Sequence, residues 1–173
     1  GARGFDVVSV RSPGDDGMWW LEDQDGKIRY LEETLDYVAA ECGANMDQLW
    51  LVGYSGGSEF ISRRVFPAYA ERMPGGGFIN FGGGDAPEER AAAFSGDAKE
   101  RLSLNWVTGT RDVPSNSLDG FDGIGHARNS LAYYRSAGFG HTWSEWPDDD
   151  HGSITEKFGR YVGRVLDDAA SGK

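Results

Sequence analysis

The chain has 173 residues, 39% of them hydrophobic, which is enough for one ordered domain and too few for two comfortable ones. A net charge of -11 argues against nucleic acid and anionic membranes as partners, because phosphate binding needs clustered Lys and Arg. No apolar run approaches the ~20 residues of a membrane helix, and the N-terminus lacks signal-peptide character. The single cysteine can form no internal disulfide, so the compartment stays open.

The N-terminal part predicts one strand and one helix. Residues 5–10 are rich in β-branched side chains and predict a strand. A loop with Trp19 and Trp20 follows. Apolar residues then recur at steps of three and four over residues 26–42, which is typical of an amphipathic helix that Gly43 can end. At the end of this helix, Cys42 is expected to be a buried structural thiol.

The middle of the chain predicts two more strands. The apolar residues 49–52 form one, and a helix follows Ser55 until Pro67 disturbs it. Residues 78–81 form the next strand, which ends at three consecutive glycines.

The C-terminal half continues the alternation of helices and strands. Helix formers fill residues 87–102, with an interruption expected around Ser95, and strands are predicted at residues 104–109 and 142–146. Helices are predicted at residues 124–137 and 154–170. Strict alternation predicts an α/β fold of about five strands, with a mostly parallel sheet and helices on both faces.

Ser55 lies in the motif Gly-x-Ser-x-Gly, directly between a predicted strand and a predicted helix. Glycines at Gly53 and Gly57 permit a tight turn that exposes the serine hydroxyl, as a nucleophile requires. A glycine-rich turn that merely connects two elements is the alternative. Ligands of parallel sheets bind at the carboxyl ends of the strands, where Ser55 lies, so we expect Ser55 to be a nucleophile.

A serine nucleophile needs a base, and the chain offers three histidines. His151 follows the last predicted strand, on the same edge of the sheet as Ser55. His126 and His141 lie near the starts of a helix and a strand, where polar or capping roles are common. We therefore expect His151 to be the base.

The base in turn needs a carboxylate to fix its tautomer. Asp112 follows the strand at residues 104–109, again on the same edge, although a turn aspartate would look the same. The chain order Ser, Asp, His is that of the α/β-hydrolases, and it favours Asp112. The rival carboxylates are Asp119, Asp122 and those of residues 148–150.

The motifs around Ser55, Asp112 and His151 together resemble an α/β-hydrolase, in the style of the esterase and polyhydroxyalkanoate-depolymerase-like branch. The resemblance runs along essentially the whole chain as a single domain, residues 1–173. It implies a serine hydrolase that cleaves small or polymeric carboxylic esters through an acyl-serine, without a cofactor. The backbone N–H of Gly56 would be one oxyanion donor.

The chain departs from the family at its front. Family members have further strands before the segment that resembles residues 4–10, and a loop there gives the second oxyanion donor. One of those strands lies between the counterparts of residues 5–10 and 49–52. We expect a missing N-terminal segment to complete the sheet, which would make this chain the C-terminal two-thirds of the fold; direct pairing of the two strands is the alternative.

Tyr54, Trp19 and Trp20 are expected to border the substrate pocket, although tryptophans often cover core instead. The acidic residues 148–150 indicate a solvated loop more than a metal site. A serine peptidase or amidase with the same triad stays open, as does a non-catalytic binding protein of the same fold.

Overall fold

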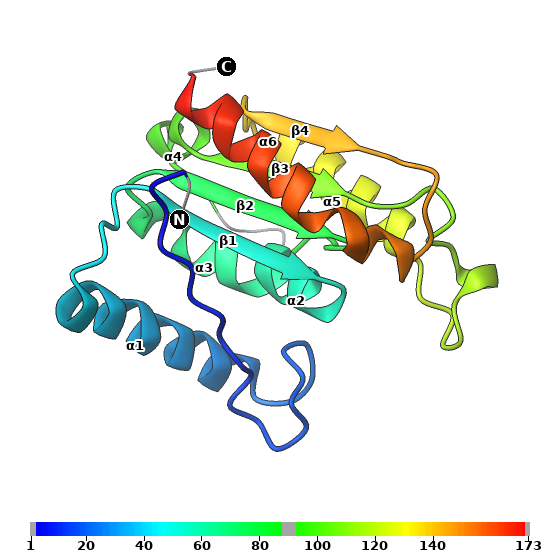
Figure 1. Ribbon diagram of the computed structural model, residues 1–173, viewed down its shortest axis with the longest axis horizontal. Helices are drawn as coiled ribbons and strands as arrows, with labels where there is room; N and C mark the ends of the chain where they lie inside the picture. The colour runs from blue at the N-terminus through cyan, green and yellow to red at the C-terminus, as the bar shows by residue number, and fades with distance from the viewer. Residues whose placement is uncertain (1–2, 88–92, 172–173) are drawn as a thin grey trace.

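The computed structural model describes residues 3–87 and 93–171, which form a four-stranded parallel sheet (Figure 1). The strand order is β1-β2-β3-β4, so each strand pairs with the next one in the chain. The strands are β1 (Leu49–Tyr54), β2 (Gly76–Phe81), β3 (Ser103–Val107) and β4 (Thr142–Glu145). All four point the same way, so their carboxyl ends meet at one edge of the sheet, which we call the carboxyl edge.

Helices cover both faces of this sheet. They are α1 (Gln24–Cys42), α2 (Gly56–Phe60), α3 (Phe66–Tyr69), α4 (Gly96–Arg101), α5 (Gly123–Ser136) and α6 (Phe158–Ala170). Figure 1 shows α6 crossing one face, with α2, α3 and α5 on the other. The sequence therefore predicted the α/β class correctly, with four strands in place of about five.

Two buried clusters form because successive strand side chains point to opposite faces of the sheet. Phe78 and Trp106 pack with Phe66 and Tyr134 under α3 and α5. The other face packs against α6 through a second set, Ile79, Phe81, Val107, Tyr161 and Val165. Both faces of β2 and β3 are thus buried, which fits the nearly continuous apolar sequence of these strands.

The predicted strand at residues 5–10 does not form. These residues are extended chain without strand pairing, and Val7 is 90% exposed. The physical reason is the lack of a neighbour: β1 pairs only with β2 among the described residues, and β-branched side chains alone do not satisfy backbone groups. Arg3 nearby holds Asp167 of α6 by two hydrogen bonds of 2.6 and 2.9 Å.

Other expectations from the sequence differ from the structure in detail. The helix predicted over residues 87–102 is helical only at α4, where the Ser95 side chain accepts a hydrogen bond from the Ala98 N–H, and residues 88–92 lie outside the described residues. Cys42 is exposed, not buried, because α1 presents this end to solvent. A π-helical turn at Ile61–Val65 joins α2 to α3 and leads the chain through Pro67. In the described part of the chain, no helix combines the length and apolar character that crossing a bilayer requires.

Candidate active site

Ser55 occupies a sharp turn between β1 and α2. Its φ of 52° and ψ of -122° are rare for a residue with a side chain, and such backbone strain costs about 1–3 kcal/mol. The Ser55 N–H donates to the Phe81 carbonyl at 2.9 Å, which ties the turn to the end of β2. Gly53 is required because a Cβ there would lie 2.8 Å from the backbone of Gly57 and Ser58. The fold therefore maintains the strain and presents the hydroxyl at the carboxyl edge.

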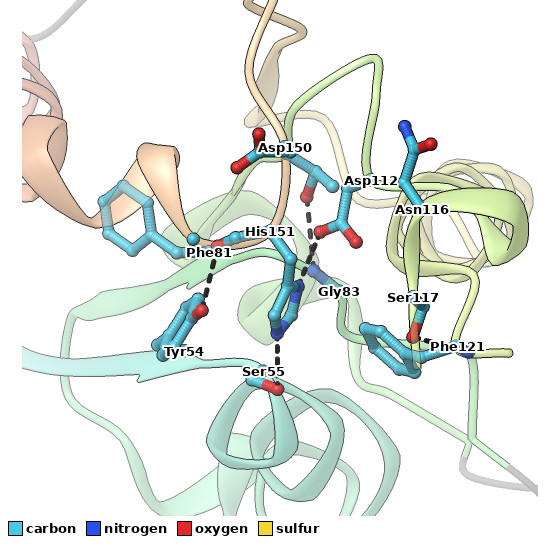
Figure 2. Close-up of polar contacts among 12 residues, drawn as sticks. Tyr54, Ser55, Phe81, Gly83, Asp112, Asn116, Ser117, Phe121, Asp150 and His151 are labelled. Atoms are coloured by element: carbon cyan, nitrogen blue, oxygen red, sulfur yellow. Dashed lines mark hydrogen bonds and ion pairs between the residues drawn. The ribbon is translucent and has the colours of Figure 1, made fainter. Parts of the chain in front are cut away.

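His151 comes from the loop after β4 and reaches Ser55 across the edge of the sheet. Its Nε2 lies 2.9 Å from the Ser55 Oγ (Figure 2). The Tyr54 hydroxyl donates to the His151 carbonyl at 2.8 Å, and the two rings stack with centroids 5.0 Å apart. Tyr54 therefore fixes both the backbone and the ring plane of His151.

Asp112 comes from the loop after β3 and completes the hydrogen-bonded series that begins at Ser55 and passes through His151. Its side chain is 1% exposed, and its Oδ2 lies 2.8 Å from the His151 Nδ1 (Figure 2). The Asp112 N–H donates to the Gly109 carbonyl, and the Asp112 carbonyl accepts from the Ile124 N–H, so both sides of the residue are anchored. An ionised carboxylate only accepts, so it selects the tautomer with hydrogen on Nδ1 and leaves Nε2 free to accept from Ser55.

The rival carboxylates have other partners. Asp122 caps the start of α5 by accepting from the Gly125 N–H, and Asp148 pairs with Arg111. Asp149 pairs with Lys157, Asp150 accepts from the Ser153 N–H, and Asp119 accepts from the Ser117 hydroxyl. The structure thus brings together the three residues that the sequence selected, and occupies their rivals elsewhere.

A pocket of about 270 Å³ opens beside Ser55 and His151. This is close to the lower end of the range for small-ligand sites, about 300–1,000 Å³. Trp20 and Phe121 form apolar parts of its wall, and Glu59 and His126 form a polar part. The pocket therefore has the size for a short acyl or alcohol group.

Of the three residues expected to border the pocket, one lines it and two lie elsewhere. Trp20 lines it, and its indole packs so closely on Gly56 that a Cβ at Gly56 would overlap the ring. Trp19 instead stacks on Phe60, with ring centroids 5.2 Å apart, and packs against the core. Tyr54 supports His151 and does not line this pocket.

Gly56 follows Ser55 as the first residue of α2. Backbone N–H groups in the first turn of a helix have no acceptor within the helix, and residues 3–87 and 93–171 supply none to the Gly56 N–H, while Gly56 lines the pocket. The position suits an oxyanion donor.

Sequence reasoning missed a second imidazole–carboxylate pair in the same pocket. The sequence predicts a polar or capping role for His126, but its Nδ1 lies 3.0 Å from Glu59 Oε1, and the Glu59 side chain is only 6% exposed. Glu59 also accepts the N–H groups of Gly84 at 2.9 Å and Asp85 at 3.2 Å. Glu59 follows Ser55 by one helical turn, and its N–H donates to the Ser55 carbonyl at 3.0 Å; this spacing was the available signal.

The two partners shift each other's pKa. Burial alone would raise the pKa of Glu59, but the hydrogen bonds from His126, Gly84 and Asp85 outweigh it and hold the pKa below its ordinary value. The pKa of His126 is raised, chiefly by the hydrogen bond to Glu59, against the opposing effect of burial. Both shifts favour the charged pair.

Glu59, Asp85 and His126 also place ligand-type atoms within 4.8 Å of one another, a spacing that a metal ion could bridge. Both oxygens of Glu59 already accept backbone N–H groups, however, and Arg63 lies 3.7 Å from the same carboxylate. The carboxylate is better suited to the hydrogen bonds that it makes.

Comparisons of this chain with protein-family models, with curated proteins and with solved structures find no match.

Proposed function

We propose that this protein is a serine hydrolase that cleaves carboxylic esters through an acyl-serine intermediate. The observation that carries the proposal is the succession from Ser55 through His151 to Asp112, with distances of 2.9 and 2.8 Å. Chain order, strand-end placement and the strained backbone at Ser55 support it, as does the resemblance of these motifs to the α/β-hydrolases.

In the proposed reaction, His151 Nε2 takes the proton of the Ser55 hydroxyl as Oγ attacks the ester carbonyl. The Gly56 N–H stabilises the developing oxyanion, and Asp112 stabilises the imidazolium. Collapse of the tetrahedral intermediate breaks the bond to the alcohol, which leaves with the proton from His151. Water then attacks the acyl-serine by the same steps and releases the acid.

The test is covalent labelling with a fluorophosphonate, followed by mass spectrometry of the adduct. We expect labelling at Ser55 that is absent in Ser55→Ala and falls sharply in His151→Ala. The variant Ser58→Ala is the matched control, since Ser58 is a buried serine on α2 whose hydroxyl donates to the Phe81 carbonyl. A folded wild-type sample that takes up no label would contradict the proposal and favour a non-catalytic binding protein.

A serine peptidase or amidase uses the same triad as an esterase. The two kinds of enzyme differ in the leaving group, which is an amine for amides and an alcohol for esters. We expect turnover of short p-nitrophenyl esters, and little turnover of the matched p-nitroanilides. Faster cleavage of the anilides would contradict the ester preference and favour a serine peptidase or amidase.

We further propose that another strand pairs with the free edge of β1. The N–H groups of Leu49 and Ser55 donate to the β2 side, so alternation along the strand places those of Trp50, Val52 and Tyr54 at the free edge. Val52, in the middle of β1, is 50% exposed. Slow hydrogen exchange at these three amides would support a paired edge, and fast exchange would contradict it.

A further inference from the structure

His126 lies in the candidate pocket but has no part in the proposed triad. Its side chain is 34% exposed, and it lines the same pocket as Ser55 and His151. The Phe121 ring stands edge-on to both imidazoles, with centroids 5.1 Å from His126 and 5.3 Å from His151. A ligand held at Ser55 is therefore within reach of a second imidazole.

Glu59 fixes which atom of His126 faces that ligand. The Glu59 carboxylate lies 3.0 Å from Nδ1, and two backbone N–H groups hold the carboxylate in place. The Nδ1–H therefore donates to Glu59. Residues 3–87 and 93–171 supply no hydrogen bond to Nε2, which leaves this nitrogen for a ligand in the pocket.

The charges around His126 favour its protonated form. Glu59 approaches from α2, Asp85 from the loop after β2, and Asp122 from the start of α5. Arg63 is the cation in this group and lies 3.7 Å from Glu59. The three carboxylates raise the pKa of His126, so that Nε2 carries a hydrogen and donates over a wider pH range than an ordinary imidazole.

We propose that His126 is a specificity-determining residue that donates its Nε2–H to a second, uncharged carbonyl oxygen on the acyl group bound at Ser55. The inference rests on the proposed function and names its substrate class: carboxylic esters whose acyl chain carries a further carbonyl. An alkyl chain would displace water from the His126 Nε2–H without accepting a hydrogen bond from it. Sites built around such a donor reject analogues that lack the acceptor for this reason. Arg63 also lines the pocket, but the carboxylates of Asp119, Glu59, Asp85 and Asp122 outnumber the cations of Arg63 and His126, so a carboxylate on the acyl group is disfavoured.

Three p-nitrophenyl esters of nearly equal size test this: the pentanoate, the 4-oxopentanoate and the hemisuccinate. We expect kcat/KM for the 4-oxopentanoate to exceed that for the pentanoate about tenfold at a pH near 6, which corresponds to one charge-assisted hydrogen bond. The hemisuccinate should be the poorest. The ratio of the two neutral esters should fall towards one as pH rises through the pKa of His126, because pH effects common to both esters cancel in the ratio.

Two variants separate the donor from its titration. His126→Asn keeps a group near the Nδ1 position for Glu59 but removes the pocket donor, so the ratio should fall to about one. His126→Gln places an amide N–H near the Nε2 position, so the ratio should persist and lose its pH dependence. A wild-type ratio near one, an unchanged ratio in His126→Asn, or a preference for the hemisuccinate would overturn the inference. Loss of the ratio on addition of EDTA would replace it with a metal site at Glu59, Asp85 and His126.

A binding measurement keeps this test separate from the proposed function. In Ser55→Ala, millimolar methyl 4-oxopentanoate should shift the His126 Nε2 resonance in imidazole ¹⁵N spectra, and methyl pentanoate should not. Normal hydrolysis of the pentanoate ester with no such shift would overturn this inference alone. Failure of fluorophosphonate labelling would overturn the proposed function, and the spectra would still decide whether His126 binds the carbonyl.

Discussion

The carboxyl edge of the sheet and the N-terminal segment before β1 differ in how far their side chains are buried and hydrogen-bonded. At the carboxyl edge, Asp112 lies in an irregular loop, yet it is nearly fully buried and hydrogen-bonded on both sides. In the N-terminal segment, Val7 and Val8 are 90% and 52% exposed despite their strand-like sequence. Partners, more than regular secondary structure, decide which side chains are fixed.

The same contrast holds between α1 and the core helices. Lys27 is the buried residue of α1, and its ammonium donates to the Leu21 carbonyl at 2.6 Å. Phe66 of α3, by comparison, is fully buried among aromatic rings from β2 and α5. The N-terminal region combines such polar contacts with partly buried apolar side chains, while α3 buries its ring fully, so substitutions in the two regions should differ in their effect on stability.

The largest expected effect is at the carboxyl edge. Asp112→Asn keeps the shape of the side chain but lets its amide face Nδ1, which favours the wrong tautomer of His151. If the proposed function holds, kcat for ester hydrolysis should fall about 10⁴-fold, as it does when the triad carboxylate of a known serine protease is replaced by an amide. Thermal unfolding monitored by circular dichroism is the control. A variant with activity within tenfold of wild type would remove Asp112 from the proposed triad.

The next effect concerns stability and compares the two regions directly. Phe66→Ala should lower the free energy of unfolding by about 3–5 kcal/mol, because it leaves a cavity in the aromatic cluster. Val7→Ala should change it by less than about 0.5 kcal/mol, because the side chain is exposed. Urea denaturation measures both. A loss above 1 kcal/mol for Val7→Ala would show that the segment at residues 5–10 is packed in solution.

A smaller effect links the two regions, since Trp20 of the N-terminal segment packs on Gly56 at the carboxyl edge. Gly56→Ala should cost about 1–3 kcal/mol of stability, because the new methyl group overlaps the indole. In a Trp20→Ala background the cost should shrink. A double-mutant cycle with a coupling of about 0.5–3 kcal/mol would support the contact, and additive effects would contradict it.

The smallest expected effect is the pH dependence of the Glu59–His126 pair. The pKa of Glu59 is lowered by folding, so its contribution is present above the unfolded value of about 4.3 and is lost as pH falls through the folded pKa. The pKa of His126 is raised, so its contribution is present below about 6.5 and is lost as pH rises through the folded pKa.

The stability difference between wild type and Glu59→Gln should therefore be largest between about pH 4.3 and 6.5, and shrink on both sides. Urea unfolding at several pH values measures it, with Glu33→Gln as a control on α1. A difference that does not vary with pH would mean that the pair is not charged in the folded protein.

The sequence by itself determined the α/β alternation and the approximate positions of β1, β2, β3 and β4. Because Ser55, Asp112 and His151 each follow a strand closely, the parallel order of the sheet is enough to bring them to one edge. Local patterns of apolar residues and glycines carry that information, since strand formation in a buried sheet depends on runs of a few residues.

The tertiary structure alone decided the features that depend on contacts between residues far apart in the chain. Residues 5–10 have the composition of a strand but lack a neighbour, and the adjacent Trp19 and Trp20 take different surroundings, one against Phe60 and one in the pocket. Glu59 and His126, 67 residues apart, meet because α2 and α5 converge beside the same edge. Pairing and burial at such separations depend on the packing of whole elements, which no local pattern in the chain specifies.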